Sequence, residues 1–193
     1  MIGEGFEAVL AAARRGEEGA WRRFYLELQP VLVGYLRGRG CAQPEDVAAE
    51  TLLQVVRDLR HFTGSEGKFR SWVFSIAHHR MIDARRHDSA RPAQPTSDEV
   101  LARHLPADRF EDQAIADLGS SEVAHLLEAC SPDQRSVLLL RYVADLTLHE
   151  VADALGKEYG AIKALHRRAL GALRAHLGVE EYPNRASRTL TSS

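Results

Sequence analysis

The sequence predicts an all-α protein of two small helical domains, an N-terminal helical bundle and a C-terminal helix-turn-helix domain, joined by a flexible linker. Apolar residues recur every three or four positions over most of the chain, with almost no alternating β pattern. A proline-bearing acidic stretch separates the two helical halves. A chain of 193 residues, 45% of them hydrophobic, suits two small domains better than one large domain. The expected boundaries are 1–92, 93–118 for the linker, 119–178, and 179–193 for a disordered tail.

Four helices are expected in the N-terminal domain, because helical periodicity runs through four segments with glycines between them. The segments are Glu4–Arg15, Glu18–Gly38, Pro44–Leu59 and Phe69–His87.

The third of these segments is amphipathic. Its apolar stripe, expected to face inward, contains Val47, Leu52, Val55, Val56 and Leu59. The opposite face carries Glu45, Asp46, Glu50, Gln54, Arg57 and Asp58. A face of this kind is usually solvated, and docking on a partner protein is the alternative.

The fourth segment combines aromatic and basic residues. Phe69, Trp72 and Phe74 lie among six basic residues, against two aspartates, between Lys68 and Arg91. Core packing explains the aromatic residues taken alone. Proteins that bind single-stranded nucleic acid also interleave rings that stack on bases with cations that follow the backbone. The combination therefore makes opened DNA a candidate partner.

The stretch between the two domains is acidic and broken by proline. Three of the seven prolines fall between Arg91 and Gly119, and Ala93–Leu118 has six acidic residues against two arginines. Such a composition predicts an extended or partly helical linker.

A helix-turn-helix is predicted from Leu146 to Leu177. Thr147 and Glu150 form a T-x-x-E capping box that starts a first helix, and Gly156 ends it. Beyond Gly160, an apolar stripe continues long enough for a four-turn helix. The same pattern fits an ordinary helical hairpin. Between Lys157 and Arg174, however, five basic residues face one acidic residue, in a chain of net charge −2, which favours contacts with DNA phosphates.

Other classes of function find little support in the sequence. No apolar run is long enough to span a membrane and the acidic N-terminus is unlike a signal peptide, so a cytoplasmic protein is expected. Cys41 and Cys130 are isolated, which argues against a zinc site or a disulfide framework. Phosphate-loop, dinucleotide, zinc-protease and nucleophile-elbow motifs are missing. We therefore expect no catalytic residue, no metal and no cofactor.

The order of these segments resembles the bacterial extracytoplasmic-function sigma factors. The resemblance runs from about Ala8 to Leu177. It rests on DVAAETLLQVVRDLRHF, KFRSWVFSIAHHRMIDARRH, the acidic linker, SPDQRSVLLLRYVADLTLHEVADALG and GAIKALHRRALGALR, in that order.

The resemblance implies a non-enzymatic subunit that binds core RNA polymerase and directs promoter-specific initiation. It implies an N-terminal domain that melts the −10 element, a C-terminal domain that binds −35 duplex DNA, and an anti-sigma protein as a regulator. The residues placed at the polymerase by the resemblance are Asp46, Glu50, Gln54 and Arg57. Those expected at the melted strand are Arg70, Trp72, His79, Arg80, Arg85 and Arg86. Those expected at the −35 duplex are Lys157, Lys163, His166, Arg167 and Arg168.

The chain departs from the family pattern at two places. His78 and His79 stand where many relatives have Arg-Asn, and metal binding by this pair is less expected than contact with solvent or phosphate. The segment from Gly160 to Leu165 lacks the hydroxyls of the family's G-T-V-K-S-R. This loss shifts the expected upstream contacts toward Lys163, His166 and the two arginines that follow.

A second hypothesis is a two-domain transcriptional regulator, in which an N-terminal bundle senses a ligand or partner and Leu146–Leu177 binds an operator. Such a protein has no use for the aromatic and basic segment Phe69–Arg91, and it would usually keep a short linker. Tight, specific binding of duplex DNA by the isolated chain would favour this hypothesis.

Overall fold

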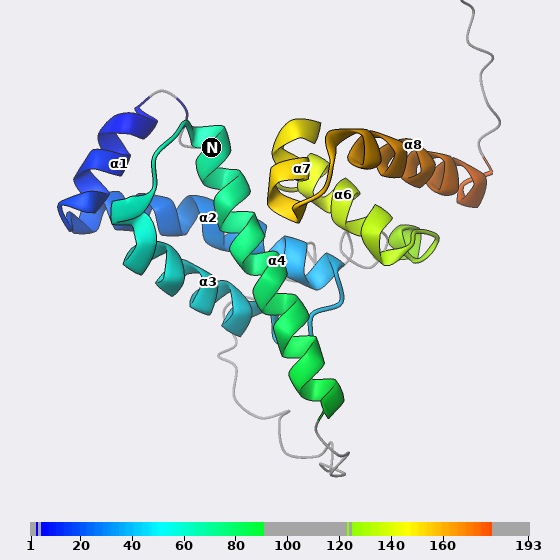
Figure 1. Cartoon of the computed structure of the whole chain (residues 1–193). Helices are drawn as coiled ribbons and strands as arrows, with labels where there is room; N and C mark the ends of the chain where they lie inside the picture. Colours follow the sequence, from blue (N-terminus) through cyan, green and yellow to red (C-terminus); the bar gives the residue numbers. More distant parts are fainter. Residues whose placement is uncertain (1–2, 4, 91–122, 124, 179–193) are drawn as a thin grey trace, which may run out of the picture.

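The computed structural model describes residues 3, 5–90, 123 and 125–178, and its regular elements are all helical (Figure 1). The all-α prediction is confirmed. The expected linker and tail lie outside the described residues. An N-terminal group contains α1 (Phe6–Arg14), α2 (Glu18–Gly38), α3 (Pro44–Asp58), the 3-10 helix η1 (Leu59–His61) and α4 (Glu66–Ala90). A C-terminal group contains α6 (Pro132–Tyr142), α7 (Leu148–Leu155) and α8 (Tyr159–His176).

The four N-terminal helices lie where their periodicity predicts them, with small differences at the ends. The third ends at Asp58 because the chain tightens there into η1. The fourth begins at Glu66, three residues earlier than predicted. Ser65 explains this start, because its carbonyl accepts the amide of Phe69 at 2.9 Å, while its hydroxyl lies 3.5 Å from the amide of Lys68.

An aromatic cluster fixes α4 against α1 and α2. The rings of Phe24 and Phe69 are 5.0 Å apart, and both side chains are at most 1% exposed. Phe6 packs on Phe69 at 5.5 Å. Phe62 stacks on Trp72 with ring centres 5.3 Å apart and an angle of 20° between the planes. Aromatic side chains bury large apolar areas, so this cluster anchors the amino-terminal half of α4.

The predicted apolar stripe of α3 is partly wrong. Val56 is 48% exposed, and its neighbour Leu53 is 56% exposed. The buried stripe instead runs through Val47, Thr51 and Val55, which are four residues apart and share one face of the helix. Thr51 is tolerated there because its hydroxyl donates to the carbonyl of Val47 at 2.7 Å. The outer face of α3 therefore carries apolar as well as charged side chains.

The C-terminal group is built on two capping boxes. Glu150 accepts the Thr147 amide at 2.7 Å, and the Thr147 hydroxyl accepts the Glu150 amide, which confirms the predicted start of α7. Gly156 ends α7 with a φ of 60°, a left-handed conformation that glycine adopts without strain. A second capping box, Ser131 with Gln134, starts α6. Fixed ends of this kind set the angle at which α8 leaves the turn.

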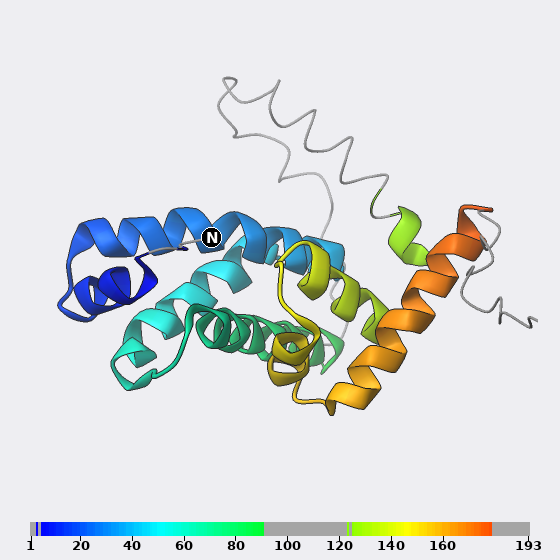
Figure 2. The ribbon, with the colours of Figure 1, turned by 90° about the horizontal axis from the view of Figure 1, so that it is seen from above.

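The two groups of helices pack against each other (Figure 2). The helix α4 lies along α7, and α2 contacts α6. The sequence predicts two helical domains joined by a flexible linker, and no pattern in it indicates that the two domains contact each other.

Candidate nucleic-acid interface

The outer face of α8 forms a groove of about 530 Å³. Four basic residues line it: Lys163, His166, Arg167 and Arg174. The side chains of Lys163, Arg167 and Arg174 are exposed, and that of His166 is half-buried. Leu148 and Leu170 contribute the apolar part of the floor. Three of the five residues predicted to bind duplex DNA therefore converge on one surface. A helix that presents cations on an open face can enter a major groove and contact phosphates or base edges.

His166 is held in this groove by Tyr142, a residue that no sequence pattern pairs with it. The hydroxyl of Tyr142 lies 3.0 Å from Nε2 of His166, and the two rings stack with centres 5.8 Å apart. The guanidinium of Arg141 lies 5.6 Å from the Tyr142 ring centre. Burial, assisted by the positive charge of Arg141, lowers the pKa of His166. His166 is therefore neutral at pH 7 and has one ring N–H to donate.

The other two residues predicted on this surface lie apart from the groove. Arg168 is exposed but does not line it. Lys157 lies in the turn before α8, where its ammonium group pairs with Asp133 of α6 at 3.1 Å. Phosphate contacts by Lys157 would have to compete with this carboxylate.

Residues predicted to bind polymerase and residues predicted to bind DNA meet in a second hollow, of about 670 Å³, between α3 and α4. Its lining includes Asp46, Glu50 and Gln54 from α3, and His79 and Arg80 from α4. Arg80 pairs with Glu50, and its Nε donates to Gln54 at 3.1 Å. These polar contacts tie the two helices together at the surface, so the two predicted sites form one continuous face.

The remaining predicted residues are spread along α3 and α4. Arg57 is exposed near the end of α3, beyond the hollow. Arg85 and Arg86 are exposed near the carboxyl end of α4, where Arg86 lies 3.5 Å from Asp83. Trp72 is half-buried and stacks on Phe62, so its visible role is packing.

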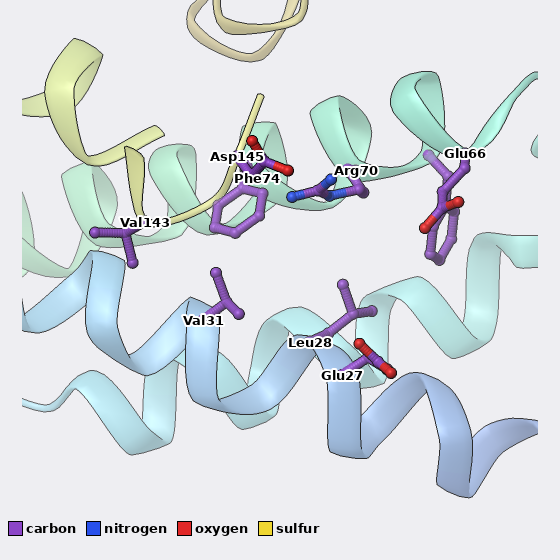
Figure 3. Close-up of a pocket in the computed structure, with 9 residues that line it drawn as sticks. Glu27, Leu28, Val31, Glu66, Arg70, Phe74, Val143 and Asp145 are labelled. Atoms are coloured by element: carbon purple, nitrogen blue, oxygen red, sulfur yellow. The ribbon is translucent and has the colours of Figure 1, made fainter. Parts of the chain in front are cut away.

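Arg70 lies in a different setting, at a cavity of about 210 Å³ between α2, α4 and the loop after α6 (Figure 3). Leu28, Phe74 and Val143 are part of its apolar lining. Figure 3 shows the Arg70 side chain extending toward Asp145 of that loop. Arg70, one of the six residues predicted to contact the melted strand, therefore faces the C-terminal group of helices in this structure.

His78 and His79 both have protein partners. Nδ1 of His78 lies 2.8 Å from the Tyr35 hydroxyl, and Nδ1 of His79 lies 2.7 Å from the carbonyl of Ser75. Burial, followed by the nearby charge of Arg39, lowers the pKa of His78 to about 4. Among the described residues, no group of three or more His, Cys, Asp or Glu side chains is placed to hold a metal ion. In the same residues, no helix is long and apolar enough to cross a membrane.

Two family descriptions match the chain, one on each group of helices. Sigma-70 region 2 matches residues 24–91, and Sigma-70 region 4 matches residues 126–175. The ECF RNA polymerase sigma factor SigD of Mycobacterium tuberculosis is 32% identical over 181 residues, which cover 90% of this chain and 84% of SigD. The ECF RNA polymerase sigma factor RpoE of Cereibacter sphaeroides is 30% identical over 168 residues, covering 83% of this chain and 88% of that protein.

Solved structures with the same fold include CnrH in complex with the cytosolic domain of CnrY. The match has a TM-score of 0.65 and 22% identity, and it covers 90% of this chain and 97% of the other. The sigma factor RpoE of Bartonella quintana, in complex with the anti-sigma factor NepR, gives a TM-score of 0.58 at 19% identity, covering 83% and 98% of the two chains.

Proposed function

Because the chain belongs to the extracytoplasmic-function (ECF) RNA polymerase sigma factors, we propose that each of three helices meets one component of the initiation complex. In this proposal α8 contacts the −35 duplex, α4 contacts the melted −10 strand, and the outer face of α3 contacts the polymerase. As a family member the protein is a transcription initiation factor and not an enzyme. It binds core RNA polymerase and directs initiation at specific promoters.

The groove on α8 is the single observation that supports the DNA assignment most strongly. Lys163, His166 and Arg167 lie together on an open helix face, and the capping box of α7 and the turn at Gly156 fix the direction of that helix. Lys163 and Arg167 supply charge for phosphates, while the neutral His166 can hydrogen-bond to a base edge. Arg174 extends the same basic line toward the end of α8.

The −10 assignment rests on the exposed basic residues of α4. His79, Arg85 and Arg86 are exposed on a helix that the aromatic cluster holds rigid. A rigid helix bearing cations can follow the backbone of a single strand while a flipped base enters a nearby hollow. Trp72 enters this proposal through the family resemblance, since its ring already packs on Phe62.

The polymerase assignment rests on the mixed character of the outer face of α3. Leu53 and Val56 are exposed next to the charged residues Glu50 and Arg57. Protein interfaces combine an apolar centre with a polar rim, and an exposed pair of large aliphatic side chains fits such a centre.

We also place the protein in the cytoplasm, where RNA polymerase acts, and propose that an anti-sigma protein controls it. Control by an anti-sigma protein is supported by analogy, because the chain shares its fold with RpoE in the RpoE–NepR complex. Co-purification with candidate binding proteins, followed by loss of transcription in their presence, would test it.

Reconstituted transcription tests the proposed division of labour. Core polymerase with the wild-type chain is expected to start RNA at a promoter with −10 and −35 elements. The Lys163→Ala, Arg167→Ala double variant should lose initiation on a duplex promoter. It should retain more initiation on a template whose −10 region is already melted and whose −35 element is absent. Equal losses on both templates would contradict the assignment of α8 to the −35 duplex.

A further inference from the structure

A buried arginine lies at the point where α2 meets α6. Arg39, the C-cap residue of α2, is only 6% exposed, and its Nη1 donates to the carbonyl of Pro132 at 2.9 Å. The preceding residue, Gly38, allows the two helices to approach closely, because a Cβ atom there would lie 2.8 Å from Cδ2 of Leu139. Arginine stays protonated in proteins, so a full positive charge is buried at this contact.

A second arginine reaches the same end of α6. Arg135 is half-buried, and its Nη2 lies 3.5 Å from the carbonyl of Cys130, two positions before the carbonyl that accepts Arg39. Within the described part of the chain, the Nε atoms of Arg39 and Arg135 are both buried and have no hydrogen-bond partner. A buried N–H group without a partner is unfavourable, so two such donors at one contact indicate that an acceptor fits there.

Arg85 of α4 adds a third positive charge on the exposed side of this contact. A Cβ atom at Gly40, the residue after Arg39, would lie 4.0 Å from Nη2 of Arg85. Burial lowers the pKa of Arg39, Tyr35 opposes this effect, and the charges of Arg85 and Arg135 add to the lowering. Arg39, Arg85 and Arg135 therefore form an arginine cluster in which like charges act on one another.

The polar groups next to the two buried guanidinium groups do not offset their charge. Burial raises the pKa of Tyr35 to about 12, so its hydroxyl stays neutral at pH 7. His78, whose Nδ1 lies 2.8 Å from that hydroxyl, is also neutral, because burial lowers its pKa to about 4. The carboxylate of Asp133, on the first turn of α6, pairs with Lys157 at 3.1 Å. Buried charges are normally matched by an opposite charge.

From this geometry we infer that the arginine cluster is a binding site for a small anion that carries a phosphate group. A phosphate has acceptor oxygens on every side, and the N–H groups of arginine form a planar fork that matches them. One such group can accept from the Nε atoms of Arg39 and Arg135 while Arg85 approaches its outer side. The site goes beyond the proposed function, because it lies apart from the groove of α8.

The burial of the site selects a small ligand over a nucleic-acid backbone. Arg39 is covered by α6, whereas the exposed Arg85 marks the side from which a small anion can enter. The phosphate group can come from inorganic phosphate or from a nucleotide whose base stays in solvent. Because the ligand links α2 to α6, its binding stabilises the folded protein.

Titration of the full chain with inorganic phosphate tests this inference. Calorimetry at pH 7.5 measures binding, and sodium chloride keeps the ionic strength constant. We expect saturable binding in the millimolar range and a rise of about 3 °C in the midpoint of thermal unfolding. A parallel titration with adenosine monophosphate distinguishes the two sources. Tighter binding than that of phosphate identifies a nucleotide as the ligand, and equal or weaker binding identifies the free anion.

Variants of Arg135 show whether the cluster is the site. Arg135→Gln removes one charge and one buried donor, so it should bind phosphate about tenfold more weakly. Its unfolding midpoint should no longer depend on phosphate. Arg135→Lys keeps the charge and lacks the planar fork, so an intermediate affinity is expected. Arg22→Gln is the matched control, because Arg22 is exposed on α2, and it should respond to phosphate as the wild type does.

Two results would overturn the inference. One is binding of phosphate that does not saturate. The other is an equal rise of the midpoint in the wild type and in Arg135→Gln, because phosphate then acts only as a generally stabilising salt. If Arg135→Gln does not fold, Arg85→Gln takes its place, since Arg85 is exposed. These assays contain no polymerase and no DNA, so their failure is distinct from failure of the proposed function.

Discussion

The Tyr142 hydroxyl and Nε2 of His166 are 3.0 Å apart, so a residue at the end of α6 orients a side chain in the basic groove of α8. The link matters for DNA binding because it holds the imidazole ring in one orientation and engages Nε2, which leaves Nδ1 for another partner. If Tyr142 donates, the free Nδ1–H of His166 points away from the pair and can meet an acceptor on DNA.

Tyr142→Phe removes this hydrogen bond and keeps the stacked ring. We expect the holoenzyme to bind a −35-containing promoter about fivefold more weakly, because one hydrogen bond contributes about 1 kcal/mol. Fluorescence anisotropy with a labelled promoter measures the effect. Tyr25→Phe is the control, since Tyr25 is 53% exposed on α2 and lies far along the chain from the groove. Unchanged affinity for Tyr142→Phe would show that the pair does not position His166 for DNA.

Removal of a single cation from the groove should change the salt dependence of promoter binding. Loss of one phosphate interaction reduces the slope of log affinity against log salt concentration by about one. We expect this change for Arg167→Ala and not for Arg22→Ala, which removes an exposed arginine from α2. Titrations of the holoenzyme at several salt concentrations provide the slopes, and equal slopes for the two variants would rule out a phosphate contact at Arg167.

The exposed apolar residues of α3 should contribute to polymerase affinity. Leu53→Ala is expected to weaken binding to core polymerase about fivefold, because the truncation removes apolar area that the interface would bury, at about 25 cal/mol per Å². The free energy of unfolding should change little, since Leu53 is 56% exposed. Leu26→Ala is a close match, as Leu26 is 61% exposed on α2. Competition against a labelled sigma factor measures the affinities, and similar values for both variants would move the docking surface away from α3.

Acidification should destabilise the folded protein through His78. Burial and the nearby charge of Arg39 lower the pKa of His78 to about 4, and Asp133 only partly offsets them. The unfolded chain, with an ordinary histidine pKa of about 6.5, takes up a proton that the folded protein does not. The contribution is therefore complete above pH 6.5 and is lost as the pH falls from about 6.5 toward 4. The chain has eight further histidines, so the comparison with a variant is decisive.

Urea unfolding of the wild type and of His78→Gln at pH 7.5 and pH 5 isolates this contribution. The difference in free energy of unfolding between the two pH values should be smaller for His78→Gln. If both proteins lose the same free energy on acidification, His78 is not the group responsible.

Local signals in the sequence predicted most of the fold, because capping boxes and helical stripes involve residues a few positions apart. Thr147, Glu150 and Gly156 start and end α7 as their types require. The period of α3 was harder to read: Val55 and Val56 are both apolar, and only Val55 is buried. Contacts between distant residues left no local trace. Examples are the contact of Gly67 with Glu150 and the pairing of Tyr142 with His166, which depend on how whole helices pack.

The site was predictable to a similar degree. The basic residues on one face of the predicted second helix indicate the groove of α8, because helical periodicity places Lys163 and Arg167 side by side. The ion pair of Lys157 with Asp133 and the position of Arg70 beside the C-terminal group were not predictable. Both depend on neighbours brought in by the tertiary fold.

Transcription reconstituted from purified core polymerase and this chain is the most direct test of its role as a sigma factor. On fragments of the host genome, RNA is expected to start at a small set of positions that share sequence near −10 and −35. The chain should also co-elute with core polymerase on gel filtration. If the polymerase fails to retain the chain, or starts RNA equally well without it, the central claim is contradicted.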